Sequence, residues 1–115
     1  QVAEIHLDHT VLNALQEVME DEYPVLLDTF VCDSEERVRL LHKSEDTILL
    51  VATAHSLKGS SSNMGATRLA ELCHQLELRA GQSAADGIRQ LVGEIDGEFA
   101  IVRRLCEQEL QRFHC

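Results

Sequence analysis

The feature that most constrains this chain is a helical periodicity that continues almost from one end to the other. Apolar residues recur every three to four positions through five successive stretches, and only 6 glycines and 1 proline interrupt the 115 residues. This spacing gathers apolar side chains on one side of a helix. No segment of strand length alternates apolar and polar residues as a half-buried strand does. The chain is therefore predicted to be all-α.

Five helices are predicted from these stretches and from the residues at their ends. They are expected at about residues 8–21, 24–42, 46–64, 67–80 and 83–113. Asp8 is a suitable N-cap, and Pro24 suits a first helical turn. Gly65 and Gly81 are suited to end the third and fourth helices, and residues 83–86 have the spacing of a capping box. Because short connections favour antiparallel neighbours, we expect an up-and-down antiparallel four-helix bundle with a short additional N-terminal helix, in one domain that spans all 115 residues.

The apolar stripes and the cysteines give an expectation for the core. The stripe of the first helix consists of Val11, Leu12, Leu15, Val18 and Met19, and that of the last helix runs from Ile88 to Phe113. Cys32, Cys73 and Cys106 lie among apolar residues and are predicted to be reduced thiols that fill the core. Cys115 ends the chain and is expected to be exposed.

The charge balance excludes some functions. Acidic residues outnumber basic ones by 20 to 10, which gives a formal net charge of −10. A general nucleic-acid-binding protein needs excess positive charge to displace counterions from phosphates, so this class is excluded. The longest apolar runs, such as residues 48–54, are far too short to span a membrane, and no secretion signal is recognised. We expect a cytoplasmic monomer, and the six histidines lack the neighbours of a convincing metal site.

Residues 55–66, HSLKGSSSNMGA, break the local pattern, because a glycine and three consecutive serines weaken a helix. At about 100° per residue, Leu57 falls on the side of the helix that faces away from His55. The residues on the His55 side are Ile48, Val51, Ala52, Lys58, Gly59 and Ser62. The imidazole of His55 is therefore predicted to face solvent, with small neighbours that leave it accessible.

This arrangement suits covalent transfer of an anionic group. A neutral imidazole is a good nucleophile near pH 7. The ammonium of Lys58, one turn further on, can donate charge-assisted hydrogen bonds to a newly attached anion such as a phosphoryl group. From the spacing alone, phosphoryl transfer and an incidental surface histidine both stay open.

A longer motif surrounds His55. It consists of His55-Ser-Leu-Lys58-Gly59-Ser-Ser, then Met64-Gly65-Ala66, then Leu69-Ala70 and Cys73, and finally Leu76-Glu77. This series resembles the signature of histidine-containing phosphotransfer (HPt) domains over residues 54–77, and the rest of the chain agrees with them in length and helix order. HPt domains are four-helix bundles with a short additional N-terminal helix, and they relay phosphoryl groups in multistep two-component signalling.

The resemblance implies a role for each motif residue. His55 would be the phosphoacceptor, and Lys58 would stabilise the phosphoryl group. Gly59 would be the small residue that admits the active site of the partner. Ser62, which lies outside the motif, either lines the site or is merely small. Glu77 would hydrogen-bond the histidine ring and fix its tautomer.

The resemblance also implies partners. The chain would accept a phosphoryl group from a receiver-domain aspartate, or from a kinase, and pass it to another receiver aspartate. It would do so as a free-standing protein or as the cytoplasmic terminal domain of a membrane-bound hybrid sensor histidine kinase. Partner docking is expected on Ile48, Val51 and Ala52. The chain is expected to bind no cofactor, because Mg²⁺ and the catalytic carboxylates would belong to the receiver, so it would be a carrier and not an enzyme. The alternative is an HPt-like interaction module that binds a receiver or kinase without being phosphorylated.

Overall fold

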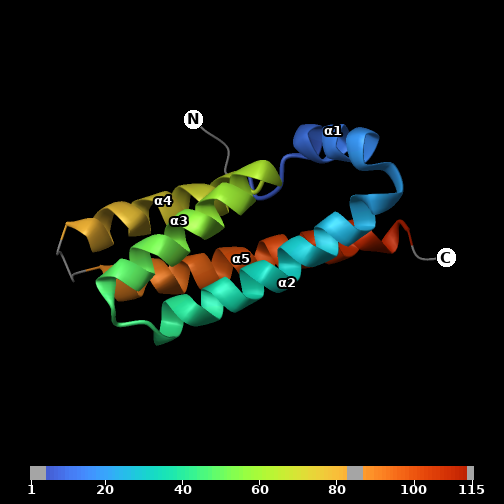
Figure 1. Cartoon of the computed structure of the whole chain (residues 1–115). Helices are drawn as coiled ribbons and strands as arrows, with labels where there is room; N and C mark the ends of the chain where they lie inside the picture. The colour runs from blue at the N-terminus through green and yellow to red at the C-terminus, as the bar shows by residue number, and fades with distance from the viewer. Residues whose placement is uncertain (1–4, 83–86, 114–115) are drawn as a thin grey trace.

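The computed structural model describes residues 5–82 and 87–113, and every regular element within these ranges is helical (Figure 1). The elements in chain order are α1 (His9–Met19), the 3₁₀ turn η1 (Glu20–Glu22), α2 (Tyr23–Lys43), α3 (Thr47–Asn63), α4 (Thr67–Gly81) and α5 (Ile88–Gln111). The capping box expected at residues 83–86 lies outside the described residues, and so does Cys115.

The long helices α2, α3, α4 and α5 form the bundle. Each of these helices packs on the one that follows it in the sequence, and α5 packs on α2 to close the bundle (Figure 1). The short helix α1 lies outside this arrangement, at the end of the bundle where α2 begins. The predicted fold, an up-and-down four-helix bundle with an additional N-terminal helix, is confirmed.

Most helices begin and end close to the predicted residues because local chemistry specifies their ends. The exception is α5, which begins at Ile88 and not near residue 83. The Asp8 and Asp46 carboxylates each accept a hydrogen bond from the backbone N–H two residues on, at 2.9 Å, and so cap α1 and α3. Pro24 lies in the first turn of α2. Gly65, between α3 and α4, has a φ of +78°, which glycine adopts without steric strain. A short turn therefore makes α3 and α4 an antiparallel hairpin.

The core is built from the apolar stripes of the four long helices, with three exceptions to the predictions. Val18 is 78% exposed, because α1 lies at the end of the bundle and fully buries only Leu12. Phe113 lies beyond the end of α5, where its ring packs edge-on against Tyr23 and stays partly exposed. Cys32 is exposed because it lies one residue, about 100°, beyond the buried face of α2. Cys73 and Cys106 are buried, as predicted.

Candidate functional site

His55 lies in the middle of α3 and points away from the core. Its side chain is 67% exposed, whereas Ala54 and Leu57, its neighbours on the inner face of α3, are fully buried. The position follows from the helical period, which carries the inner-face positions into the bundle and leaves residue 55 outside. An imidazole in the middle of a helix, rather than on a loop, is held in a fixed position by the backbone on both sides.

Glu77 of α4 joins His55 and Lys58 into one cluster. Its Oε2 lies 2.9 Å from His55 Nδ1, and its Oε1 lies 2.9 Å from Lys58 Nζ. The hairpin at Gly65 makes these contacts possible, because it brings the middle of α4 alongside the middle of α3. The Glu77 side chain is 22% exposed, so the carboxylate lies at the edge between core and solvent. The contact with the ring is the one that the family resemblance implies.

The charge of Glu77 decides which ring nitrogen of His55 donates the hydrogen bond between them. The hydrogen bond from Lys58 lowers the pKa of Glu77, the contact with His55 lowers it further, and partial desolvation opposes both effects. Glu77 is therefore ionised at neutral pH, and a carboxylate can only accept hydrogen bonds. His55 Nδ1 must then carry the proton and donate to Glu77, which leaves the lone pair of the neutral ring on Nε2.

The immediate surroundings of the ring are open. A side-chain carbon placed on Gly59 would meet no atom within 4 Å, and both Gly59 and Ser62 are exposed. Along the same helix toward its start, Ile48 is 80% exposed and Ala52 is exposed, whereas Val51 is only partly so. The structure therefore places the predicted site residues of α3 on the same side of the helix as His55, and the space around Gly59 is open.

One feature of the site was not predicted from the sequence. A shallow depression of about 350 Å³ adjoins Lys58 in the groove between α3 and α4. It is lined by Lys58, Ser62, Thr67, Ala70, Glu71 and His74. Positions 67, 70 and 74 precede Glu77 by ten, seven and three residues, so they share its side of α4. Their spacing from Glu77 in the sequence is the signal that could have predicted that these residues lie together beside the site.

Among residues 5–82 and 87–113, no three His, Cys, Asp or Glu side chains are grouped so that they could hold a metal ion. His6, which with His9 was the closest histidine pair in the sequence, contacts Glu98 instead. Within the same ranges, no helix combines the length and apolar character that crossing a membrane requires.

Comparison with known proteins identifies the family. The family model for the Hpt domain matches residues 25–112. The chain belongs to the Hpt-domain family. No curated protein sequence matches it. Hpt domains are phosphotransfer carriers that work with response-regulator receivers and kinases in two-component phosphorelays, and this chain is a carrier of that class.

Solved Hpt structures agree with this assignment. Histidine-containing phosphotransfer protein B (HptB) from Pseudomonas aeruginosa PAO1 is 56% identical to the chain, with a TM-score of 0.90 over 93% of the chain and 96% of HptB. A putative histidine-containing phosphotransfer protein from rice is 19% identical, with a TM-score of 0.81 over 92% and 80% of the two chains. The maize protein ZmHP2 is 22% identical, with a TM-score of 0.80 over 96% and 86%. The two plant structures share the fold.

Proposed function

We propose that His55 is the residue of this Hpt domain that carries the phosphoryl group. It accepts the group from the aspartyl phosphate of a receiver domain, or from a kinase, and passes it to the aspartate of another receiver. The observation that carries the proposal is the contact of 2.9 Å between His55 Nδ1 and Glu77, on a ring that is 67% exposed. It leaves the lone pair on Nε2, the nitrogen that is not engaged by Glu77.

The transfer can be written so that atoms and charges balance. The Nε2 lone pair of His55 forms a bond to phosphorus while the bond between phosphorus and the aspartate oxygen of the receiver breaks. The electron pair of that bond returns to the aspartate, which leaves as a carboxylate. The Nδ1 proton stays on the ring, which becomes a cation that the Glu77 carboxylate stabilises. Onward transfer is the same reaction in reverse, with a second receiver.

Lys58 is proposed to neutralise charge during transfer. Its ammonium is bonded to Glu77 in the unmodified protein, and it lies on the His55 side of α3. A phosphoryl group on Nε2 would offer it a second anionic partner. Gly59 and Ser62 would leave room for the active site of the receiver. The exposed side chains of Ile48 and Ala52, with the partly exposed Val51, would contact its surface.

The remaining chemistry is proposed to come from the partner. The Mg²⁺ ion and the acidic residues that bind it would belong to the receiver, so positioning and charge neutralisation would be divided between two proteins. The chain would act as a monomer in the cytoplasm, either free or as the terminal domain of a hybrid sensor kinase.

Phosphoramidate, a small phosphoryl donor that needs no docking surface, tests the proposal. Incubation with it should add one phosphoryl group to His55, stable to base and labile to acid, and labelled protein should then lose the group to a receiver domain in the presence of Mg²⁺. Absence of any label on His55 would favour the alternative of an interaction module that is not phosphorylated. Label on another histidine would refute the assignment of His55.

A further inference from the structure

A buried carboxylate lies outside the His55 site. The side chain of Glu98, in the middle of α5, is only 4% exposed. Its Oε2 lies 2.6 Å from His6 Nδ1, and its Oε1 lies 3.7 Å from Arg68 Nε. A carboxylate is buried without a large penalty only when partners replace the water that it loses. Three parts of the chain that are distant in sequence therefore meet at Glu98.

Residues 5–8, the strap, run past the end of the α3–α4 hairpin before α1 begins (Figure 1). Backbone hydrogen bonds hold the strap at both ends. The N–H of Arg68 donates to the carbonyl of Ile5 at 3.0 Å, and the N–H of Asp8 donates to the carbonyl of Gly65 at 2.8 Å. The contact between His6 and Glu98 lies between these two bonds in the sequence of the strap.

The strap and α1 together fully bury fewer apolar side chains than any of the four long helices. Leu12 is the fully buried residue of α1 and Leu7 that of the strap, while Leu15 and Met19 are partly buried against the core. Val18, by contrast, is 78% exposed. Segments with few buried apolar contacts open at lower free energies than the core of the same protein. The polar contacts of the strap must therefore contribute much of what holds α1 in place.

We infer that the strap and α1 open as one unit from an intact four-helix bundle. The contact between His6 and Glu98 sets the equilibrium between the closed and the open state. In the open state Glu98 keeps Arg68 as a charged neighbour, so the bundle is not left with an isolated buried charge. Opening exposes the apolar side chains of Leu7 and Leu12 at the end of the bundle. The match of the family model to residues 25–112, which starts after α1, agrees with a bundle that is a unit without it.

The His55 site is not part of this unit. His55 and Lys58 lie in α3, and Glu77 lies in α4. The strap touches the hairpin at Gly65 and Arg68, beyond the last residue of α3 and at the start of α4. An opening strap therefore changes the surface at the end of the bundle and leaves the site itself assembled.

Native-state amide hydrogen exchange of the whole chain tests the inference. The N–H groups of Asp8 and Arg68 report on the strap, because both donate to partners across it, whereas those of Leu57 and Cys73 report on the bundle. In His6→Ala, exchange at the two strap amides should accelerate by about 10- to 100-fold, and exchange at the two bundle amides should stay unchanged. Unchanged strap amides, or equal acceleration in the bundle, would overturn the inference.

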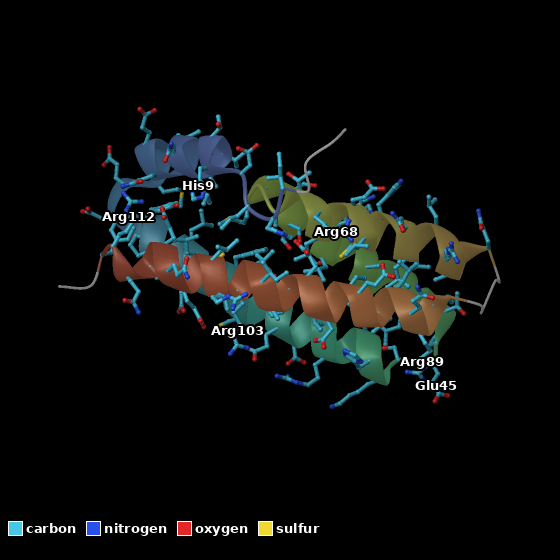
Figure 2. All side chains as sticks on the ribbon, turned by 180° about the vertical axis from the view of Figure 1, so that it is seen from behind. His9, Glu45, Arg68, Arg89, Arg103 and Arg112 are labelled. Carbon is cyan, nitrogen blue, oxygen red and sulfur yellow. The ribbon has the colours of Figure 1, made fainter. Side chains whose placement is uncertain are left out.

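His9→Ala is the matched control. His9 is exposed at the start of α1, and Figure 2 shows it apart from Arg68. His9→Ala should leave the exchange rates of the strap amides unchanged. An acceleration equal to that in His6→Ala would contradict a specific role for the contact between His6 and Glu98. Labelling of His55 by phosphoramidate should proceed at the same rate in His6→Ala as in the unmodified chain, and a slower rate would contradict the separation of strap and site. If neither protein were labelled, the proposed function would fail while the exchange result would still stand.

Discussion

His55 and Glu77 are 22 positions apart in the sequence, and Nδ1 of the first lies 2.9 Å from Oε2 of the second. A single contact between neighbouring helices thus sets both the orientation of the exposed ring and the nitrogen on which its proton lies. Because Glu77 also bonds Lys58, a change at any one of the three residues should be felt by the other two.

Replacement of His55 tests the phosphoacceptor directly. His55→Gln should abolish acid-labile labelling, because the amide side chain has no nucleophilic nitrogen. The side chain is mostly exposed, so the free energy of unfolding should change by no more than about 0.5 kcal/mol. Mass spectrometry after treatment with phosphoramidate measures the label, and circular dichroism checks the helices. Labelling that persists in a folded His55→Gln protein would refute the assignment.

The acid dependence of stability should reveal Glu77. Its pKa is lowered in the folded protein from an ordinary value of 4.5, first by the hydrogen bond from Lys58. A lowered carboxyl pKa contributes stability that is fully present above pH 4.5 and is lost as the pH falls through the folded-state pKa. Glu77→Gln should therefore lower the free energy of unfolding, by about 1 kcal/mol near pH 7, and the difference from the unmodified protein should shrink below pH 4.5. Urea unfolding between pH 3 and pH 7 measures it, and a difference that is constant over this range would contradict the prediction.

Lys58→Ala should affect transfer more than docking. The ammonium acts on a phosphoryl group whose charge shifts during the reaction, so its loss should slow transfer by roughly 10- to 100-fold. The affinity for a receiver should change much less. The same variant should raise the pKa of Glu77 toward its ordinary value, which an NMR titration of the carboxyl carbon can follow. Equal losses in rate and affinity would argue against the role in transfer.

A matched pair of variants can separate the effect of Gly59 on access to the His55 ring from its effect on the stability of the helix. Gly59 and Gly93 are both exposed in helices, and a side-chain carbon at either would meet nothing within 4 Å. Alanine at either position should stabilise the protein by about 1 kcal/mol. Gly59→Leu should slow phosphoryl transfer from a receiver, because the new side chain would lie beside His55. Gly93→Leu should leave the transfer rate unchanged. Similar transfer rates for the two leucine variants would show that access to the ring is not limiting.

The cysteines should differ in reactivity. Burial raises the pKa of the Cys73 and Cys106 thiols to about 12, so both should stay protonated and unreactive at pH 8. Cys32 is exposed and should be alkylated by iodoacetamide in the folded protein. Peptide mapping after alkylation, with and without denaturant, distinguishes the sites, and modification of Cys73 before Cys32 would contradict the structure.

The sequence predicted the features that depend on local chemistry. The ends of α1 and α3 follow from Asp8 and Asp46, and the left-handed turn follows from Gly65. The exposure of His55 follows from the period of α3. The contact with Glu77 was implied by the resemblance of the motif to the family, and not by the helical period.

The errors and omissions arise where tertiary packing overrides the local pattern. Val18 continues an apolar stripe, but only a helix that lies along the bundle can bury a whole stripe, and α1 lies at its end. Cys32 has apolar neighbours in sequence, but a helix turns it outward. His6 and Glu98 are 92 positions apart, and no periodicity relates residues across the four α-helices between them.

The turn at Gly65 has a consequence for how this domain can change over evolution. Since α3 and α4 are joined by so short a turn, the residues of one helix that face the other lie at fixed positions relative to it. A single amino acid inserted in α4 between the turn and Glu77 would rotate that carboxylate by about 100° around its helix, away from the imidazole. Single substitutions between His55 and Glu77 leave the register of the two helices unchanged. A single insertion or deletion in this segment should not be tolerated, because it would separate the imidazole from the carboxylate.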